Sequence, residues 1–494
     1  MCLNLAVMDI MQKIIPSPPV SRQRSNIWSN FEFLYQRLIP ASVIIILLFL
    51  AVAASYVLVN VSPIIAIASL LAVPAFILLL SKPDLGLLLV IFVLPLEEFN
   101  VKGGFSAIKF ISAAVFGCAI LNYLIFRRRE PLVRASQNGL IILFLLVSLI
   151  SVFVAIDPAR TLARLPKLLR VVALYFFVIN LIKAEKNFQI ALWLFLIGGF
   201  VCTLYGFFDP AQVSGRFQGA LGQPNGYALT MTPRVPIALA LLLIDKNFLR
   251  RTLVVFMLGT IIYGIILSGS RGGLLSISLA LVLFAVLQKN RVVWLGIISA
   301  IFAIGLLIMP QDIKVRVGLT TTPASSDLGN STDRRLTYQI YGAQLFQEHT
   351  IIGIGLDGFA EAYARSQYRF LIRTKYLGVA HNTYLEIATG TGVVGLIPFL
   401  GILGSAIFLA WKYSRKKYWK LSSELATIST GLVAALGGYY LGMLFGSRQY
   451  EKTLWFLLAL PIVMQILINT RMKYQKNSEN SQNQHTQTLV SNEK

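Results

Sequence analysis

Long apolar segments recur along this chain of 494 residues, and they constrain its fold more than any other feature. A helix rises about 1.5 Å per residue and the bilayer core is about 30 Å thick, so roughly 20 apolar residues can cross it. About 12–14 transmembrane helices are expected, near residues 41–60, 62–80, 84–98, 106–126, 138–156, 168–183, 188–208, 226–244, 252–268, 273–288, 292–310, 383–410, 425–446 and 453–470. With 56% hydrophobic and 13% charged residues, the chain could not solvate a soluble surface, which predicts an all-α polytopic membrane protein.

Basic residues are concentrated in the short connections between these segments, where they set the orientation of a membrane protein. Basic residues precede the first segment and recur in every second connection, which places both chain ends in the cytoplasm. These connections contain Arg127–Arg129, Lys183 and Lys186, Arg250 and Arg251, Lys289 and Arg291, and Arg415–Lys417. The net charge of +23 is therefore assigned to orientation and anionic lipid, and no nucleic-acid partner is expected.

This orientation divides the chain into five parts. Residues 1–40 are a cytoplasmic N-terminal segment, and residues 41–310 are transmembrane helices with short loops. Residues 311–382 form one long outer loop. Residues 383–470 are C-terminal transmembrane helices, and residues 471–494, rich in Asn, Gln and Ser, are predicted to be a disordered cytoplasmic tail.

One basic cluster falls on the outer side, against the general pattern. Arg160, Arg164, Lys167 and Arg170 recur at about one helical turn. Their spacing predicts an amphipathic segment lying on the outer surface, the alternative being that one span has been miscounted.

Two glycine-rich outer loops each contain an arginine. Arg216 lies in GRFQGALGQPNG (215–226), where glycines allow close approach of a ligand and the guanidinium fits phosphate oxygens. Arg271 lies in SGSRGG (268–273), at the start of a helix, where backbone N–H groups favour anions. The structural alternatives are an arginine that extends to lipid head groups and an interfacial arginine in a tight turn. Arg234, deeper within a span, is given no role.

The long outer loop ends at His381, at the mouth of the apolar helix AHNTYLEIATGTGVVGLIPF (380–399). A histidine titrates near neutral pH and can accept a proton from a hydroxyl. Glu386 lies one turn deeper and either orients His381 or pairs with an arginine. A structural, helix-capping histidine is the alternative.

Several arginines and one histidine are therefore expected on one face of the membrane, and no metal cluster accompanies them. Arginines suit a diphosphate leaving group, and a histidine suits activation of an acceptor hydroxyl. These residues favour glycosyl transfer from a lipid diphosphate without a metal. Cys2, Cys118 and Cys202 have no metal-ligand spacing, so no disulfide framework, zinc site or cofactor is expected.

Four motifs in order resemble the O-antigen ligase and O-antigen polymerase (Wzy-type) superfamily, over roughly residues 205–400: GRFQGALGQPNGYA, SGSRGG, RRLTYQ with IIGIGLDGF, and HNTYLEIATGTGVVGL. The last, with its His-Asn pair and paired glycines, is the most specific. The resemblance implies a GT-C-like fold with one long periplasmic loop. It also implies glycan transfer from undecaprenyl diphosphate to a glycan, lipid or protein acceptor, at the periplasmic face of the inner membrane and without a metal.

The same resemblance implies roles for individual residues. Arg216 and Arg335 would hold the diphosphate, and His381 would activate the acceptor hydroxyl. Arg271 matches the Ser-Arg-Gly turn of the family, and the expected supporting residues are Asn225, Arg334, Asn382 and Glu386. Two features depart from the family: Gln339 stands where many members have Trp, and the Arg334–Arg335 doublet leaves the assignment open by one residue.

Two other functions are weighed against transfer. A small-anion transporter, of the bicarbonate type proposed for some relatives, would have broken helices and polar groups near the middle of the membrane. The His-Asn motif favours the transferase. A structural subunit of a polysaccharide export machine would not require arginines and a histidine on one face.

Overall fold

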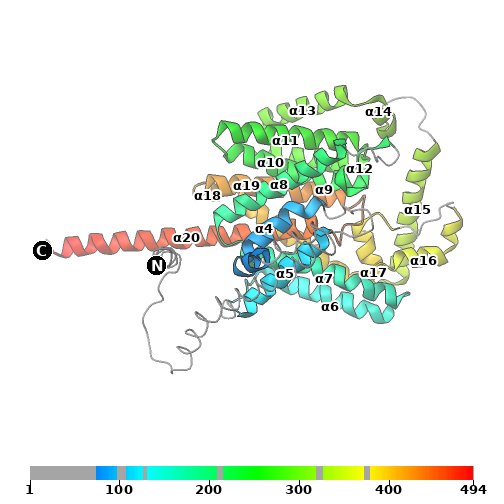
Figure 1. Ribbon diagram of the computed structural model, residues 1–494, viewed down its shortest axis with the longest axis horizontal. Coiled ribbons are helices and arrows are strands. Elements are labelled where there is room, and N and C mark those ends of the chain that lie inside the picture. Colours follow the sequence, from blue (N-terminus) through cyan, green and yellow to red (C-terminus); the bar gives the residue numbers. More distant parts are fainter. Residues whose placement is uncertain are drawn as a thin grey trace, which may run out of the picture. The chain divides into compact units, whose positions relative to one another are not determined.

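The computed structural model describes residues 74–96, 107–125, 131–208, 215–318, 326–371 and 379–492, and every regular element in these ranges is a helix (Figure 1). Eight of these helices are long and apolar enough to cross a membrane, or nine if the pair Pro74–Ser81 and Pro83–Leu96 is one span. The predicted all-α polytopic membrane fold is confirmed. The chain divides into two units, Met1–Leu78 and Leu79–Lys494, and helices α4 to α20 belong to the second.

Each predicted apolar segment in the described ranges corresponds to a helix or to a pair of consecutive helices. The helices are α4 (Pro83–Val93), α5 (Ala107–Ile125), α6 (Ser136–Ile150), α7 (Pro158–Leu181), α8 (Glu185–Phe208), α9 (Pro224–Met231), α10 (Arg234–Ile244), α11 (Phe248–Leu267), α12 (Arg271–Leu287), α13 (Arg291–Ile308), α17 (Thr383–Ser414), α19 (Ser423–Gly442) and α20 (Lys452–Asn492). The predicted N-terminal segment 1–40, the segment 41–60 and most of 62–80 lie outside the described residues.

The predicted long loop contains helices of its own. These are α14 (Gln311–Val317), α15 (Ser326–Glu348), α16 (Phe359–Arg365) and the 3-10 helix η5 (Gln367–Leu371). Helix α15 begins at Ser326, before Arg334 and Arg335. Arg335 therefore lies inside a helix and shares a face with residues three and four positions later.

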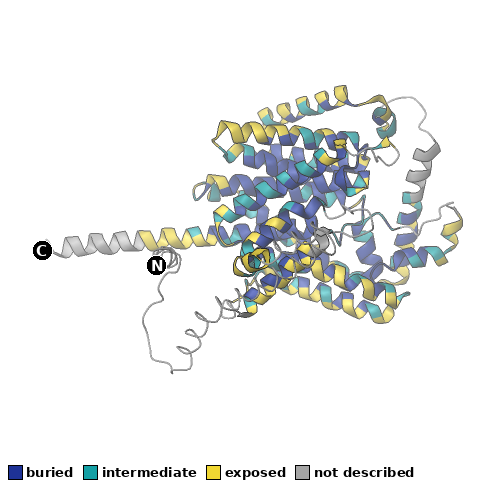
Figure 2. Ribbon diagram, in the orientation of Figure 1, coloured by how far each residue is buried: buried dark blue, intermediate teal, exposed yellow. Residues whose placement is uncertain are grey.

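Helix α19 lies at the centre of the bundle, packed against α10, α12 and α17. Of its apolar window, 83% of residues are buried, against 6% for the peripheral helix α13 (Figure 2). Glycine permits this close packing, because a Cβ at Gly438 would lie 2.7 Å from the carbonyl oxygen of Ser276 on α12. The centre of the bundle is thus held by backbone-to-backbone proximity.

Helix α17 is broken at Gly392, where φ is +63°. The carbonyl oxygen of Thr389, which the break leaves without its helical partner, accepts from the N–H of Ile354 at 2.9 Å. Beyond the break, the N–H of Val393 donates to the carbonyl oxygen of Thr350 at 2.7 Å. The glycine-rich stretch 351–359 of the predicted long loop therefore inserts against α17 and satisfies its interrupted backbone, as apolar surroundings require.

Two expectations differ from the structure. Arg160, Arg164, Lys167 and Arg170 do not form a separate surface segment, because they lie in the first half of α7, which continues through an apolar stretch to Leu181. Asp157 caps this helix by accepting from the N–H of Arg160 at 3.0 Å. Residues 471–494 were expected to be a disordered tail, but α20 continues as helix to Asn492, and after Pro461 it contains no further proline or glycine to end it.

Candidate active site

Arg216 joins the two glycine-rich loops. Its Nε donates to the carbonyl oxygen of Ser268 at 2.9 Å, and its Nη2 donates to Oδ1 of Asn225 at 3.0 Å. Asn225 lies in the first turn of α9, which begins with Pro224. The predicted supporting role of Asn225 therefore corresponds to a direct contact that orients the guanidinium.

Arg316, which the sequence did not single out, packs against the second of these loops. A Cβ at Gly269 would lie 3.1 Å from Cδ of Arg316 and 3.7 Å from its Nε. Gly269 follows Ser268, whose carbonyl oxygen binds Arg216. Helix α14 therefore places a second guanidinium beside the turn that Arg216 contacts.

Arg216, Arg316 and Arg335 form one electrostatic cluster. Burial, together with the positive charges of Arg316 and Arg335, lowers the pKa of Arg216 to about 10. All three remain charged near neutral pH. Like charges held together in a half-buried site are unfavourable alone, and a bound dianion would offset their repulsion.

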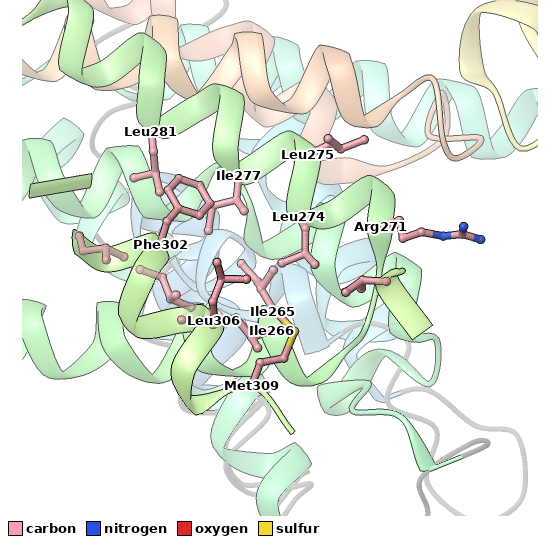
Figure 3. Close-up of a pocket in the computed structure, with 14 residues that line it drawn as sticks. Ile265, Ile266, Arg271, Leu274, Leu275, Ile277, Leu281, Phe302, Leu306 and Met309 are labelled. Atoms are coloured by element: carbon pink, nitrogen blue, oxygen red, sulfur yellow. The ribbon is translucent and has the colours of Figure 1, made fainter. Parts of the chain in front are cut away.

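Arg271 is exposed at the first position of α12, at the rim of an apolar pocket of about 330 Å³ (Figure 3). The pocket lies between α11, α12 and α13, and Figure 3 shows the guanidinium directed away from its lining. Ser270 caps the helix by accepting from the N–H of Gly273 at 3.2 Å. A cation at a helix N-terminus opposes the helix dipole, so capping does not explain this arginine.

Arg448, also missed from the sequence, extends towards the start of α9. A Cβ at Gly226 would lie 3.4 Å from its Nη2, and its Nη1 pairs with Glu451 at 2.9 Å. Within the described residues, its buried Nε makes no hydrogen bond. The backbone N–H of Arg448 donates to Oγ1 of Thr383 at 2.9 Å, which joins this arginine to the first turn of α17.

Helix α15 carries Arg335 and contacts His381 through the same face. Tyr338 and Gln339 follow Arg335 by three and four positions, so the three side chains lie together. The rings of Tyr338 and His381 are 6.2 Å apart. Gln339 donates from Nε2 to the carbonyl oxygen of Ala380 at 3.1 Å. Arg335, the predicted anion-binding arginine, therefore lies on the face of α15 that contacts the segment of His381, the predicted base.

His381 has a left-handed backbone, with φ of +52°. Non-glycine residues adopt this conformation uncommonly, and at a functional site the surrounding contacts enforce it. Here the residues on both sides are fixed, since Gln339 holds Ala380 and also accepts from Nδ2 of Asn382 at 3.0 Å. Asn382 in turn caps α17 by accepting from the N–H of Tyr384 at 3.0 Å.

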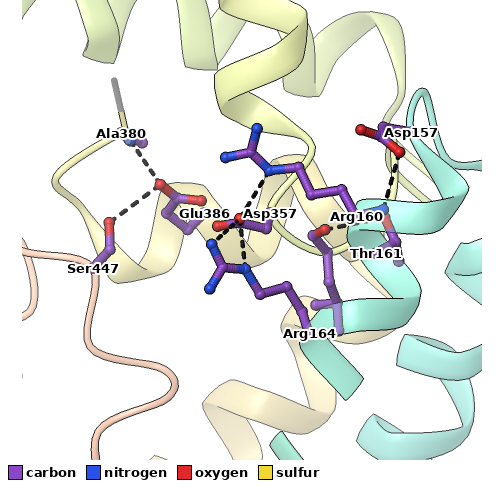
Figure 4. A network of polar contacts seen from close by, with 9 residues as sticks. Asp157, Arg160, Thr161, Arg164, Asp357, Ala380, Glu386 and Ser447 are labelled. Atoms are coloured by element: carbon purple, nitrogen blue, oxygen red, sulfur yellow. Dashed lines mark hydrogen bonds and ion pairs between the residues drawn. The ribbon is translucent and has the colours of Figure 1, made fainter. Parts of the chain in front are cut away.

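Glu386 is buried and holds the irregular segment that contains Ala380 and His381 (Figure 4). Its Oε1 accepts from the N–H of Ala380 at 2.7 Å and from Oγ of Ser447 at 3.2 Å. Of the two expected roles, orientation of His381 fits these contacts, and it acts through the backbone of the preceding residue.

Asp357 connects the outer loop to α7. Its Oδ2 accepts from Nε of Arg160 at 3.1 Å and from Nε of Arg164 at 2.7 Å (Figure 4). The Asp357 side chain is 7% exposed, and its φ is +62°. The first two turns of α7 therefore fix the stretch that fills the break in α17.

Arg234 is held by contacts inside the bundle, although its buried Nη2 makes no hydrogen bond within the described residues. It is fully buried, its Nε donates to the carbonyl oxygen of Phe195 at 2.9 Å, and its Nη1 donates to that of Thr230. Its guanidinium also lies 3.9 Å from the centre of the Phe195 ring. These contacts join α8 to the segment where α9 ends and α10 begins.

The predicted residues thus separate into groups. Arg216 and Asn225 form one group, and Arg271 follows the turn that Arg216 contacts. Asn382 and Glu386 form a second group around His381, and Arg335 lies on the helix that contacts this group and influences Arg216 electrostatically. The side chain of Arg334 lies outside the described residues. The sequence offered a signal for two of the residues it missed. Arg316 is a cation in the predicted long loop, and Gln339 stands where many family members have Trp. Within the described residues, no three His, Cys, Asp or Glu side chains are grouped to hold a metal ion.

Residues 253–400 match the family model described as O-antigen ligase. The matched region extends from the first turns of α11 to the middle of α17 and includes Arg271, Arg316, Arg335 and His381. Arg216 precedes this region and Arg448 follows it. No curated protein matches the chain. The family match confirms the resemblance and covers three of its four motifs, because GRFQGALGQPNGYA lies before residue 253.

Proposed function

We propose that this member of the O-antigen ligase and polymerase superfamily transfers a glycan from an undecaprenyl-diphosphate-linked donor to an acceptor hydroxyl. The family itself implies a glycan-transferring enzyme of surface polysaccharide assembly in a membrane. The proposal adds the donor, metal independence, and a periplasmic active face on the inner membrane with both termini cytoplasmic.

The observation that carries the proposal is the arginine cluster beside His381. Arg316 and Arg335 both influence Arg216 electrostatically, and Arg335 shares a helix face with Tyr338 and Gln339, which contact the segment of His381. Guanidinium groups bind phosphate oxygens in a bidentate manner and retain their charge when half-buried. Such a cluster is suited to a leaving group that carries two phosphates.

The proposed reaction follows from this arrangement. His381 accepts the proton of the acceptor hydroxyl as its oxygen attacks the anomeric carbon of the donor glycan. The new glycosidic bond forms as the bond between that carbon and the diphosphate oxygen breaks, and the electron pair leaves with the diphosphate. The arginines stabilise the developing negative charge in place of a metal. Asn382, Glu386 and Gln339 hold the histidine in position.

The apolar pocket between α11, α12 and α13 supports a lipid-linked donor. Its lining is almost entirely aliphatic, with Arg271 at the rim (Figure 3). An isoprenoid chain would lie against such a surface, because burial of each CH₂ group contributes about 0.8 kcal/mol. The diphosphate would then lie on the side of Arg271 and Arg216.

The transporter alternative expects broken helices that line an aqueous path. Helix α17 is broken, but the backbone of residues 350–355 occupies the break. The buried Arg234 binds carbonyl oxygens of α8 and α9. The break is therefore filled by the chain itself, and Arg234 makes two hydrogen bonds inside the bundle, which favours the transferase.

The test compares His381→Ala with His349→Ala in a deletion strain. His349 serves as the control because it is exposed, in the turn directly after α15. Surface glycan and lipid-linked precursor are measured together with protein abundance. We expect precursor to accumulate and surface glycan to disappear only in His381→Ala. Short single-repeat glycans would then identify a polymerase, and unattached long chains a ligase. Normal glycan in a stable His381→Ala protein would overturn the proposal.

A further inference from the structure

The connection between α19 and α20 lies after the matched family region and is bound to the start of α17. Thr383, which is fully buried in the first turn of α17, makes three of these contacts. Its N–H donates to the carbonyl oxygen of Met443 at 2.8 Å, and its Oγ1 donates to that of Gly446 at 2.7 Å. The same Oγ1 accepts from the N–H of Arg448 at 2.9 Å. The backbone of Arg448 is therefore fixed against the helix that follows the proposed base.

The guanidinium of Arg448 extends from this connection to the first turn of α9. A Cβ at Gly446 would lie 3.1 Å from its Nε, and a Cβ at Gly226 would lie 3.4 Å from its Nη2. Gly226 directly follows Asn225, whose Oδ1 accepts from Nη2 of Arg216 at 3.0 Å. Arg216 and Arg448 therefore reach adjacent positions of one helical turn from segments that are far apart in the sequence.

One edge of the Arg448 guanidinium is unused. Nη1 donates to Oε1 of Glu451 at 2.9 Å, whereas the buried Nε makes no hydrogen bond within the described residues. The side chain is only 11% exposed, and an unpaired donor in such a position is unfavourable. Nε and Nη2 form the edge of the planar group that can bind two phosphate oxygens at once. This edge therefore points to an anionic ligand.

We propose that Arg448 is a further phosphate-binding residue of the donor site, which holds the diphosphate together with Arg216 across the first turn of α9. Within the described residues no side chain caps this turn, so its backbone N–H groups favour an anion as well. Because Arg448 is bound through Thr383 to the helix of His381, a diphosphate held here is also positioned relative to the proposed base. The inference rests on the proposed function, which supplies the diphosphate.

The test measures binding of undecaprenyl diphosphate, without a glycan, to the purified full-length chain by native mass spectrometry. Arg448→Gln is expected to weaken this affinity by about tenfold to a hundredfold, the effect of losing one charge-assisted pair. Affinity for undecaprenol, which has the same hydrocarbon chain and no phosphate, should stay as in the wild type. Equal weakening for both lipids would indicate a general loss of structure and would overturn the assignment.

Glu451→Gln is the matched control, because it removes the same ion pair and leaves the guanidinium in place. We expect this variant to bind undecaprenyl diphosphate at least as tightly as the wild type, since the guanidinium is released from a competing carboxylate. A loss equal to that in Arg448→Gln would mean that the ion pair alone matters, and the assignment would fail.

Arg216→Ala separates failure of this inference from failure of the proposed function. If Arg216→Ala weakens binding of undecaprenyl diphosphate and Arg448→Gln does not, the donor site stands without Arg448. If neither substitution weakens binding, the donor assignment and this inference both fail. Weaker binding in both variants, with Glu451→Gln unaffected, supports the two together.

Discussion

Gln339 and Asn382 are joined by a hydrogen bond of 3.0 Å, from Nδ2 of the asparagine to Oε1 of the glutamine. Through the same amide, Gln339 also donates to the carbonyl oxygen of Ala380, so it holds the residues on both sides of His381. Gln339 lies one helical turn after Arg335 on α15. One side chain thus couples the helix of the proposed anion-binding arginine to the proposed base.

Removal of this coupling is predicted to reduce turnover and to leave donor binding nearly unchanged. In Gln339→Ala both hydrogen bonds are lost and His381 is no longer held in its left-handed conformation. We expect kcat to fall by about tenfold to a hundredfold, since small misplacements of a catalytic group have effects of this size. Steady-state kinetics with purified enzyme measure the change. Gln347→Ala, exposed on the same helix, should behave as wild type, and an equal loss in both variants would argue against positioning.

The pH dependence of donor binding is predicted to respond to Arg216→Lys. The charged form of residue 216 binds the diphosphate, so binding is lost as pH rises through its pKa, which is about 10 for Arg216. Lysine has an ordinary pKa about two units below that of arginine, and burial with Arg316 and Arg335 acts on it in the same direction. The alkaline limb of kcat/KM should therefore move to lower pH by about two units.

A surface substitution provides the comparison for this pH profile. Arg365 is exposed and pairs with Glu361 at 2.9 Å. Arg365→Lys should leave the alkaline limb where the wild type has it. An unshifted limb in Arg216→Lys would mean that Arg216 does not contact the donor.

Asp357→Asn is predicted to destabilise the protein by about 2–3 kcal/mol, because it leaves two partly buried guanidiniums without their carboxylate. Nε of Arg160 and Nη2 of Arg164 lie 3.1 and 2.6 Å from Oδ2 of this side chain. Thermal unfolding in detergent measures the effect. Glu361→Gln, which removes only an exposed pair with Arg365, should change stability by less than about 0.5 kcal/mol. Equal effects of the two substitutions would contradict the buried clamp.

The sequence predicted the helices because lipid leaves a helical chain few alternatives, and each described apolar segment is helical. It also indicated Arg216 and His381, because charged and titratable groups at the edge of lipid are costly without a function. The family resemblance indicated Arg335. Arg316, Arg448 and the Asp357 clamp were missed. Their roles depend on contacts between residues far apart in the chain, such as Asp357 and Arg164, and no local pattern encodes these.

Gly392→Ala is predicted to destabilise the protein by at least about 2 kcal/mol, since φ of +63° is strained for alanine. An added Cβ would also lie 2.1 Å from the carbonyl oxygen of Ile351, so the inserted loop would have to move. Gly404, in the same helix, offers the control, because a Cβ there meets no atom within 4 Å. Gly404→Ala should be neutral or stabilise by up to about 1 kcal/mol, as alanine favours helix. Thermal unfolding of both variants measures these changes in stability, and turnover is measured in parallel. A wild-type melting temperature in Gly392→Ala would show that the break in α17 can close without cost.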